Sequence, residues 1–108
     1  MKSTAALSVL GDFSIDERTI HINPNDGFDL GLMTTEYTIR LHVGAETDPS
    51  ALDEKDYIYG KILLKNEVRG GHVEVGLKSA ERLDGATKAV VHFSEGDRYG
   101  TVLVTPAH

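Results

Sequence analysis

Residues 36–43, with the sequence EYTIRLHV, alternate regularly between apolar and polar side chains. The apolar positions are Tyr37, Ile39, Leu41 and Val43. Successive side chains of a strand point to opposite faces of a sheet, so a period of two gathers these four residues on one face. The segment therefore predicts a β-strand with one buried and one exposed face.

The same period of two extends outward from this segment along most of the chain. Further candidate strands lie at residues 5–16, 19–23, 28–32, 57–64, 72–78, 87–94 and 99–105. The apolar positions change parity near residues 33–35, where we expect a bulge or a bend. Seven or eight short strands with turn residues between them predict an all-β fold, specifically a single domain over residues 1–108 built as an antiparallel β-sandwich or barrel. No internal repeat is evident.

One acidic segment, residues 44–56, lacks the strand period. Within it, Asp48 suits the N-cap of a helix and Pro49 suits the first helical position. We therefore expect one short helical turn near residues 48–56 and no helix elsewhere.

Composition and charge exclude several classes of site and function. Seventeen Asp and Glu residues against eleven Lys and Arg residues give a net charge of −6, and the chain has no cysteine. The lack of cysteine excludes disulfides, thiolate metal sites and a cysteine nucleophile. Nucleic-acid binding is not expected because the cationic side chains are not clustered. No apolar run approaches the ~18 residues of a membrane helix, so we expect a cytoplasmic protein without membrane contact.

The C-terminal strands can be paired by their turn residues. A two-residue turn would pair Val91 with Val102, and the preceding hairpin would pair Val75 with Phe93. Both hairpins place these four residues on the core side. Val90 then faces away from the core.

The outer side of this C-terminal hairpin is more apolar than a solvated face requires. Its predicted contact residues are Val90, His92, Tyr99, Thr101 and Leu103. An apolar centre with a polar rim is typical of an interface, so the first functional hypothesis is a non-catalytic binding or assembly module. Its partner would be a second copy, most simply in a two-fold dimer, or another protein, bound through a sheet face or edge. The alternative is that this side faces a second layer of the same domain.

The oxygen-rich residues 23–29 suggest a different class of function. Asn23, Asn25, Asp26 and Asp29 could offer oxygen ligands to calcium or another metal, or hydrogen bonds to a carbohydrate. The residue spacing of a calcium-binding loop is absent, and the same residue types suit a plain β-turn. We therefore expect no cofactor, and metal or carbohydrate binding is an alternative function.

Histidines occupy outward positions on separate predicted strands. They are His21, His42, His72 and His92. No two of them have the close spacing typical of metal ligands, and no serine lies in the Gly-x-Ser-x-Gly context of a nucleophile. The sequence does not predict catalysis, and a small enzyme that uses a histidine–carboxylate pair is a second alternative.

Overall fold

The computed structural model describes residues 1–107. The strands are β1 (Lys2–Ser3), β2 (Leu7–Gly11), β3 (Thr19–Ile22), β4 (Glu36–Val43), β5 (Ile58–Leu64), β6 (His72–Val75), β7 (Lys88–Ser94) and β8 (Gly100–Ala107). The helices are α1 (Pro24–Asp29) and α2 (Leu77–Arg82), with 3₁₀ turns at Pro49–Ala51 and Glu54–Asp56. The predicted all-β class is therefore confirmed, and strand β4 has the bounds that its alternation predicts.

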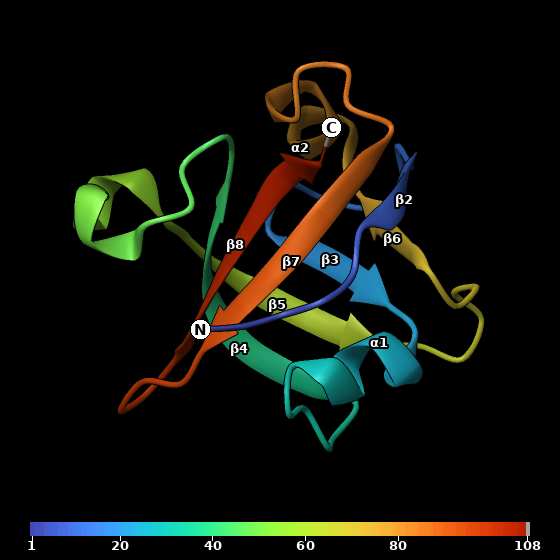
Figure 1. Ribbon diagram of the computed structural model, residues 1–108, viewed down its shortest axis with the longest axis horizontal. Coiled ribbons are helices and arrows are strands. Elements are labelled where there is room, and N and C mark those ends of the chain that lie inside the picture. The colour runs from blue at the N-terminus through green and yellow to red at the C-terminus, as the bar shows by residue number, and fades with distance from the viewer. Residues whose placement is uncertain (108) are drawn as a thin grey trace.

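Seven of the strands close into a barrel in the order β7-β2-β6-β3-β5-β4-β8, and β8 pairs back onto β7 (Figure 1). Strand β1 is an additional strand on β7. Three neighbouring pairs are parallel: β2 with β6, β3 with β5, and β4 with β8. Of the predicted antiparallel sandwich or barrel, the barrel is the architecture found, whereas the sandwich and the purely antiparallel pairing are wrong. The prediction assumed that consecutive strands pair as hairpins, whereas β6 lies between β2 and β3.

The barrel consists of two halves with the same order of elements, β2-β3-α1-β4 and β5-β6-α2-β7. Counterpart residues in the two central strands lie 53 positions apart: Ile20 corresponds to Val73, and His21 to Glu74. His21 and Glu74 also face each other in the antiparallel β3–β6 pair, so an approximate two-fold axis passes through that pair. The sequence conceals this repeat because few counterpart residues are identical.

Both α-helices are corrections to the sequence analysis, which confined helix to residues 48–56. The predicted strand 28–32 overlaps the end of α1, and α2 replaces the end of the predicted strand 72–78 and the start of the hairpin expected to join it to the strand 87–94. The helices lie on opposite sides of the barrel, near the bottom and the top of Figure 1. Leu30 and Leu83, which directly follow α1 and α2, are both buried in the core. Each helix therefore ends by placing a leucine in the barrel.

The last hairpin has a longer loop and a different register from those predicted. Phe93 pairs with Val102 and Val91 with Val104, a shift of two residues from the predicted pairs. The loop covers residues 95–99 rather than two residues. A shift of two leaves every side chain on its predicted face, since side chains alternate with a period of two. The predicted pairing of Val75 with Phe93 is wrong, because β6 pairs with β2 and β3.

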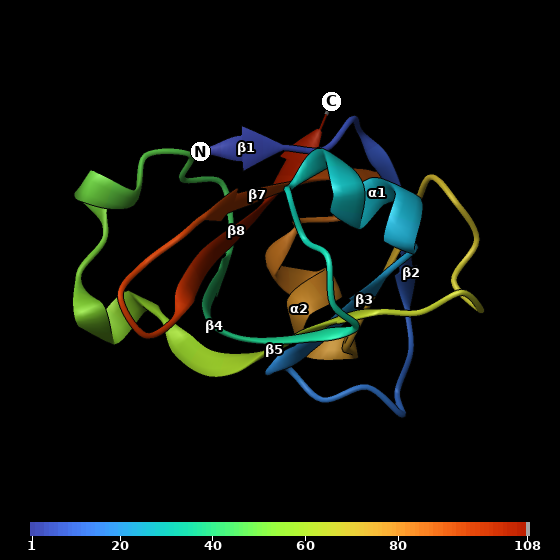
Figure 2. The ribbon, with the colours of Figure 1, turned by 90° about the horizontal axis from the view of Figure 1, so that it is seen from below.

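Strand β8 is buried on both of its faces. All five residues from 101 to 105 are buried, whereas β4 and β7 alternate between buried and more exposed positions. Figure 2 shows β8 between β4 and β7, where it closes the barrel. Across residues 1–107, no helix has the length and apolar character needed to cross a membrane.

Candidate functional site

A hollow of about 540 Å³ lies where β4, β5 and β8 meet the β7–β8 loop and the two 3₁₀ turns. Its walls are polar and aromatic. They include Arg40 on β4, Tyr59 on β5, Thr101 on β8, Glu54 on the second turn and Tyr99 at the end of the loop. The closure of the barrel by β8 brings these residues together, because β8 runs parallel to β4 and places Thr101 beside Arg40.

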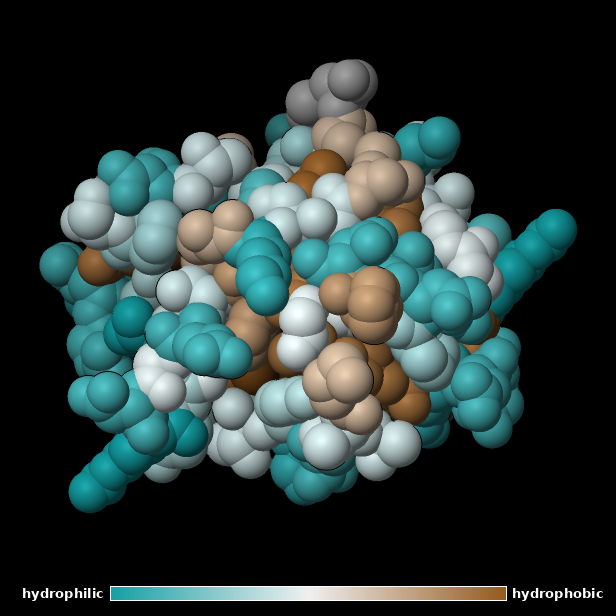
Figure 3. Space-filling model, turned by 60° about the horizontal axis from the view of Figure 1, so that its bottom comes forward, coloured by the Kyte–Doolittle hydropathy of each residue, from teal (hydrophilic) through white to brown (hydrophobic). Residues whose placement is uncertain are grey.

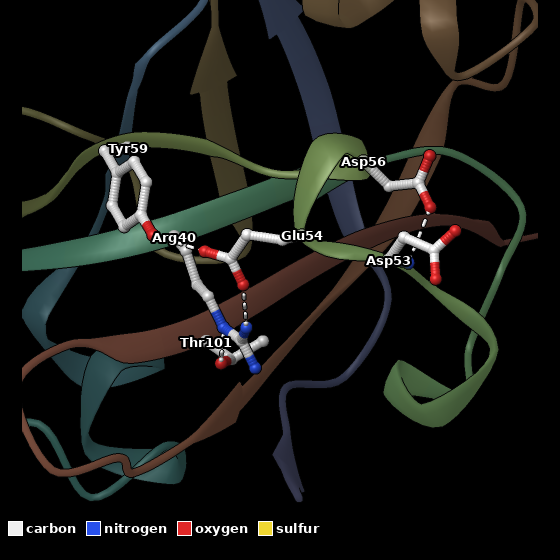
Figure 4. Close-up of polar contacts among 6 residues, drawn as sticks. All are labelled: Arg40, Asp53, Glu54, Asp56, Tyr59 and Thr101. Carbon is white, nitrogen blue, oxygen red and sulfur yellow. Dashed lines mark hydrogen bonds and ion pairs between the residues drawn. The ribbon is translucent and has the colours of Figure 1, made fainter.

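Arg40 forms the centre of the hollow and is held on three sides. Its Nε donates a hydrogen bond to Thr101 Oγ1 at 2.7 Å, and one terminal nitrogen lies 3.3 Å from a carboxylate oxygen of Glu54 (Figure 4). The flat face of the guanidinium lies 4.4 Å from the ring centre of Tyr57, a cation–π contact. These contacts fix the side chain in one position.

Two tyrosines form the accessible aromatic part of the hollow. The Tyr59 hydroxyl donates a hydrogen bond to the second carboxylate oxygen of Glu54. The rings of Tyr59 and Tyr99 meet edge to face with their centres 5.2 Å apart, and 46% and 40% of these residues' surface is exposed. Large aromatic residues left this accessible beside fixed charges are typical of recognition surfaces.

The second 3₁₀ turn places Glu54 in the hollow. Asp53 precedes the turn as its N-cap residue, and its backbone N–H donates to Asp56 Oδ2 at 2.7 Å (Figure 4). The backbone oxygen of Asp56 lies 2.8 Å from His42 Nδ1, which ties the turn to β4. The helical turn predicted near residues 48–56 is present as two short 3₁₀ turns, and the second places Glu54 beside Arg40.

The ionisation of the hollow follows from these contacts. Burial raises the pKa of Tyr57, against the opposing effect of the nearby Arg40 charge. The hydrogen bond to Glu54 raises the pKa of Tyr59. Both phenols are therefore neutral near pH 7. The charged side chains that line the hollow are the carboxylates of Glu54, Glu95 and Asp97 and the guanidinium groups of Arg40 and Arg98.

The predicted interface residues are divided between the surface and the interior. Tyr99 is exposed, and Val90 and His92 are half-buried. Leu103 is fully buried and Thr101 is 7% exposed. Leu103 has a histidine opposite it on each neighbouring strand, His42 on β4 and His92 on β7. Of the five, Tyr99 and Thr101 line the hollow.

The oxygen-rich residues 23–29 form α1 and use several of their oxygens within the protein. Asn23 caps the helix by accepting from the Asn25 backbone N–H at 2.8 Å, and its amide donates to the Val68 carbonyl. Asp26 accepts from the Gly71 backbone N–H at 2.9 Å. Asp29 is exposed at the end of the helix. Across residues 1–107, no three histidine, cysteine or acidic side chains are grouped to hold a metal ion.

One histidine–carboxylate pair lies on the approximate two-fold axis. His21 Nδ1 is 3.3 Å from Glu74 Oε1. Both residues line a hollow of about 370 Å³ beside the β2–β3 loop, residues 12–18, and the β5–β6 loop, residues 65–71. The nearby Ser14 hydroxyl donates to Asp12 rather than to His21. The pair therefore has the groups of an acid–base dyad without a serine nucleophile bonded to it.

Sequence analysis missed Arg40, Glu54 and Tyr59 as site residues. Arg40 and Tyr59 are opposite each other in the β4–β5 pair, and both point outward from the barrel. An outward arginine and an outward tyrosine are ordinary on a solvated strand, so neither carries a signal alone. Only the pairing of β4 with both β5 and β8 gathers them.

Comparison of the chain with protein-family models, with curated proteins and with solved structures finds no match in any of the three.

Proposed function

We propose that this protein is a non-catalytic binding module that recognises an arginine side chain of a protein partner in the hollow around Tyr59 and Tyr99. The observation that carries the proposal is the exposed edge-to-face pair of tyrosines in a hollow rimmed by carboxylates. A guanidinium is flat, stacks on aromatic rings and forms hydrogen bonds with carboxylates.

The charge of the hollow favours a cationic group. Arg40 is already paired with Glu54 and stacked on Tyr57, so its charge is offset within the protein. Of the charged side chains on the β7–β8 loop, Glu95 and Asp97 are acidic and Arg98 is basic. The whole chain carries a net charge of −6, which also attracts a basic partner.

The closed barrel determines how a partner would be bound. Within residues 1–107, the seven barrel strands have neighbours on both sides, and only the two-residue β1 lies at an edge. Addition of a partner strand to a sheet edge needs a row of unpaired backbone groups, which a closed barrel removes. Recognition by side chains in a hollow is therefore favoured over pairing through a sheet edge.

Catalysis is less well supported than binding. The His21–Glu74 pair lacks a hydrogen-bonded serine, and the charged groups around Tyr59 hold one another in fixed positions. A catalytic dyad needs a nucleophile or a bound water activated by its base.

The test is a titration followed by amide chemical shifts of the ¹⁵N-labelled protein. The probe is a capped Gly-Gly-Arg-Gly-Gly peptide, and its matched control contains neutral citrulline in place of arginine. We expect shifts centred on Tyr59 and residues 94–99, with the arginine peptide binding about tenfold more tightly than the citrulline peptide, as expected for one cation–π contact and a surface ion pair.

Two variants assign the binding to the hollow. Tyr99→Ala should abolish the shifts, whereas Phe28→Ala, which removes an exposed aromatic ring on α1, should leave them unchanged. Equal binding of the two peptides, or shifts centred away from the hollow, would overturn the proposal. Shifts in the hollow caused by a neutral oligosaccharide but not by the arginine peptide would favour carbohydrate binding instead.

A further inference from the structure

We propose that a second copy of this chain docks on an apolar patch formed by Phe13 and Leu77, so that two copies associate across a two-fold axis. Phe13 is 87% exposed and Leu77 is 52% exposed. With Ile15 they line a hollow of about 330 Å³, whose other walls are Asp16, Glu17 and Lys78. The proposed contact involves no residue of the tyrosine hollow.

The backbone on either side of Phe13 is held in place, although the Phe13 side chain is exposed. The backbone N–H and the hydroxyl of Ser14 both donate to Asp12 Oδ1, at 2.8 and 2.7 Å, and the Ile15 N–H donates to the Asp12 carbonyl at 3.1 Å. These hydrogen bonds form a tight turn with Phe13 near its tip. The two hydrogen bonds from Ser14 lower the pKa of Asp12, because they favour its charged carboxylate. Because the backbone of this turn is already ordered, binding through Phe13 costs little backbone conformational entropy.

The barrel itself does not require an apolar residue at this position. The β2–β3 loop and the β5–β6 loop are counterparts in the two halves of the fold. The residue of the β5–β6 loop that corresponds to Phe13 is Asn66. Both loops connect equivalent strands. A large apolar residue on one loop, and a polar one on the other, points to a role of Phe13 outside the barrel.

The charges around the patch favour a second copy as its occupant. Glu17 is paired with Arg82 at 3.3 Å, Asp16 lies on one side, and Lys78 lies on α2. These two acids and two bases balance, in a chain whose net charge of −6 otherwise repels another copy. A two-fold axis brings the acidic side of each patch against the basic side of the other. A strongly acidic or strongly basic partner would match only half of this rim.

The expected dimer is weak. The exposed apolar side chains that we assign to the contact are few, whereas a stable interface buries about 800 Å² on each partner. We expect the dimer fraction to rise over the range from about 10 µM to 1 mM. Sedimentation equilibrium across this range measures it directly.

Two variants test whether Phe13 makes the contact. Phe13→Asn, which installs the residue of the counterpart loop, should keep the melting temperature and yield a monomer at 1 mM. The control Phe28→Asn changes an exposed aromatic residue on α1 and should leave dimerisation unchanged. Figure 3 shows the side of the molecule that carries α1, where apolar side chains also gather among hydrophilic ones. The control therefore tests whether dimerisation depends on Phe13 in particular or on any exposed apolar side chain.

Charge-reversal variants test whether the charged rim of one copy meets the rim of the other. Lys78→Glu and Glu17→Lys should each weaken the dimer at low salt, and an equimolar mixture of the two variants should restore it, because both rim contacts of the mixed dimer then join opposite charges. A wild-type protein that stays monomeric at 1 mM, a dimer insensitive to Phe13→Asn, or a mixture no more associated than its components would each overturn the proposal.

Discussion

His92, on the outer surface of the barrel, makes the stability of the fold depend on pH. Its Nδ1 lies 2.7 Å from the Ser3 hydroxyl and its Nε2 lies 3.0 Å from the Thr105 hydroxyl. Burial lowers the pKa of His92 relative to that of an exposed histidine. The folded protein therefore favours the neutral imidazole, which can accept from one hydroxyl and donate to the other.

The sign of the pH dependence follows from this lowered pKa. The contribution of neutral His92 to the free energy of unfolding is complete above the pKa of the unfolded chain, near 6.5, and is lost as the pH falls through the lower pKa of the folded state. We expect His92→Gln to reduce the loss of stability between pH 7 and pH 5. The measurement is urea unfolding at a series of pH values.

The matched control for this pH series is His72→Gln. His72 is half-buried, and its Nδ1 lies 3.2 Å from the carbonyl oxygen of the nearby Gly70. It should keep the wild-type pH dependence. A His92→Gln variant whose unfolding free energy falls as steeply as that of the wild type would show that His92 is not responsible.

At the scale of elements, the two short helices end in the same way with different residues. The C-cap residues Leu30 and Leu83 are followed by Gly31 and Asp84, which lie at counterpart positions. Both have left-handed backbone conformations, with φ of 76° and 55°. Glycine adopts this conformation without strain, whereas a residue with a Cβ does so at a cost.

Replacement of Asp84 by glycine should therefore stabilise the protein. The relief of left-handed strain exceeds the greater flexibility that glycine gives the unfolded chain, and we expect a net gain of about 0.5 kcal/mol in the free energy of unfolding. Urea unfolding measures this gain. Gly31→Ala is the converse change and should lower the free energy of unfolding by about 1 kcal/mol. A loss of stability in Asp84→Gly would indicate that the Asp84 side chain makes a stabilising contact.

The sequence predicts the strands of this fold well and the short helices poorly. Residues 36–43 alternate over eight positions, long enough for the period of two to be unambiguous. Helix α1 has six residues, and Phe28 and Leu30 at its end mimic strand alternation with Leu32. In the structure Phe28 is 70% exposed while Leu30 and Leu32 are buried, a contrast that alternation cannot predict.

At the scale of the whole molecule, strand partners depend on information that local patterns lack. The prediction joined neighbouring strands as hairpins, yet β2 pairs with β6 and β4 with β8 across more than sixty residues. Tyr99 and Thr101 were predicted as contact residues from the C-terminal hairpin alone. The parallel β4–β8 pair places Arg40 beside Thr101, and the β4–β5 pair places Tyr59 opposite Arg40. A prediction based on the hairpin alone contains neither pair.

The position of β8 in the barrel is the central structural claim, because the tyrosine hollow exists only if β8 closes the barrel in this register. Cross-strand nuclear Overhauser effects on the uniformly labelled protein test it most directly. We expect contacts of Phe93 with Val102 and of Leu41 with Val102, together with contacts between the ring protons of Tyr59 and Tyr99. Backbone contacts that pair Val91 with Val102 and Phe93 with Val75, and no contact between the two tyrosine rings, would contradict the closed barrel and support an antiparallel sandwich.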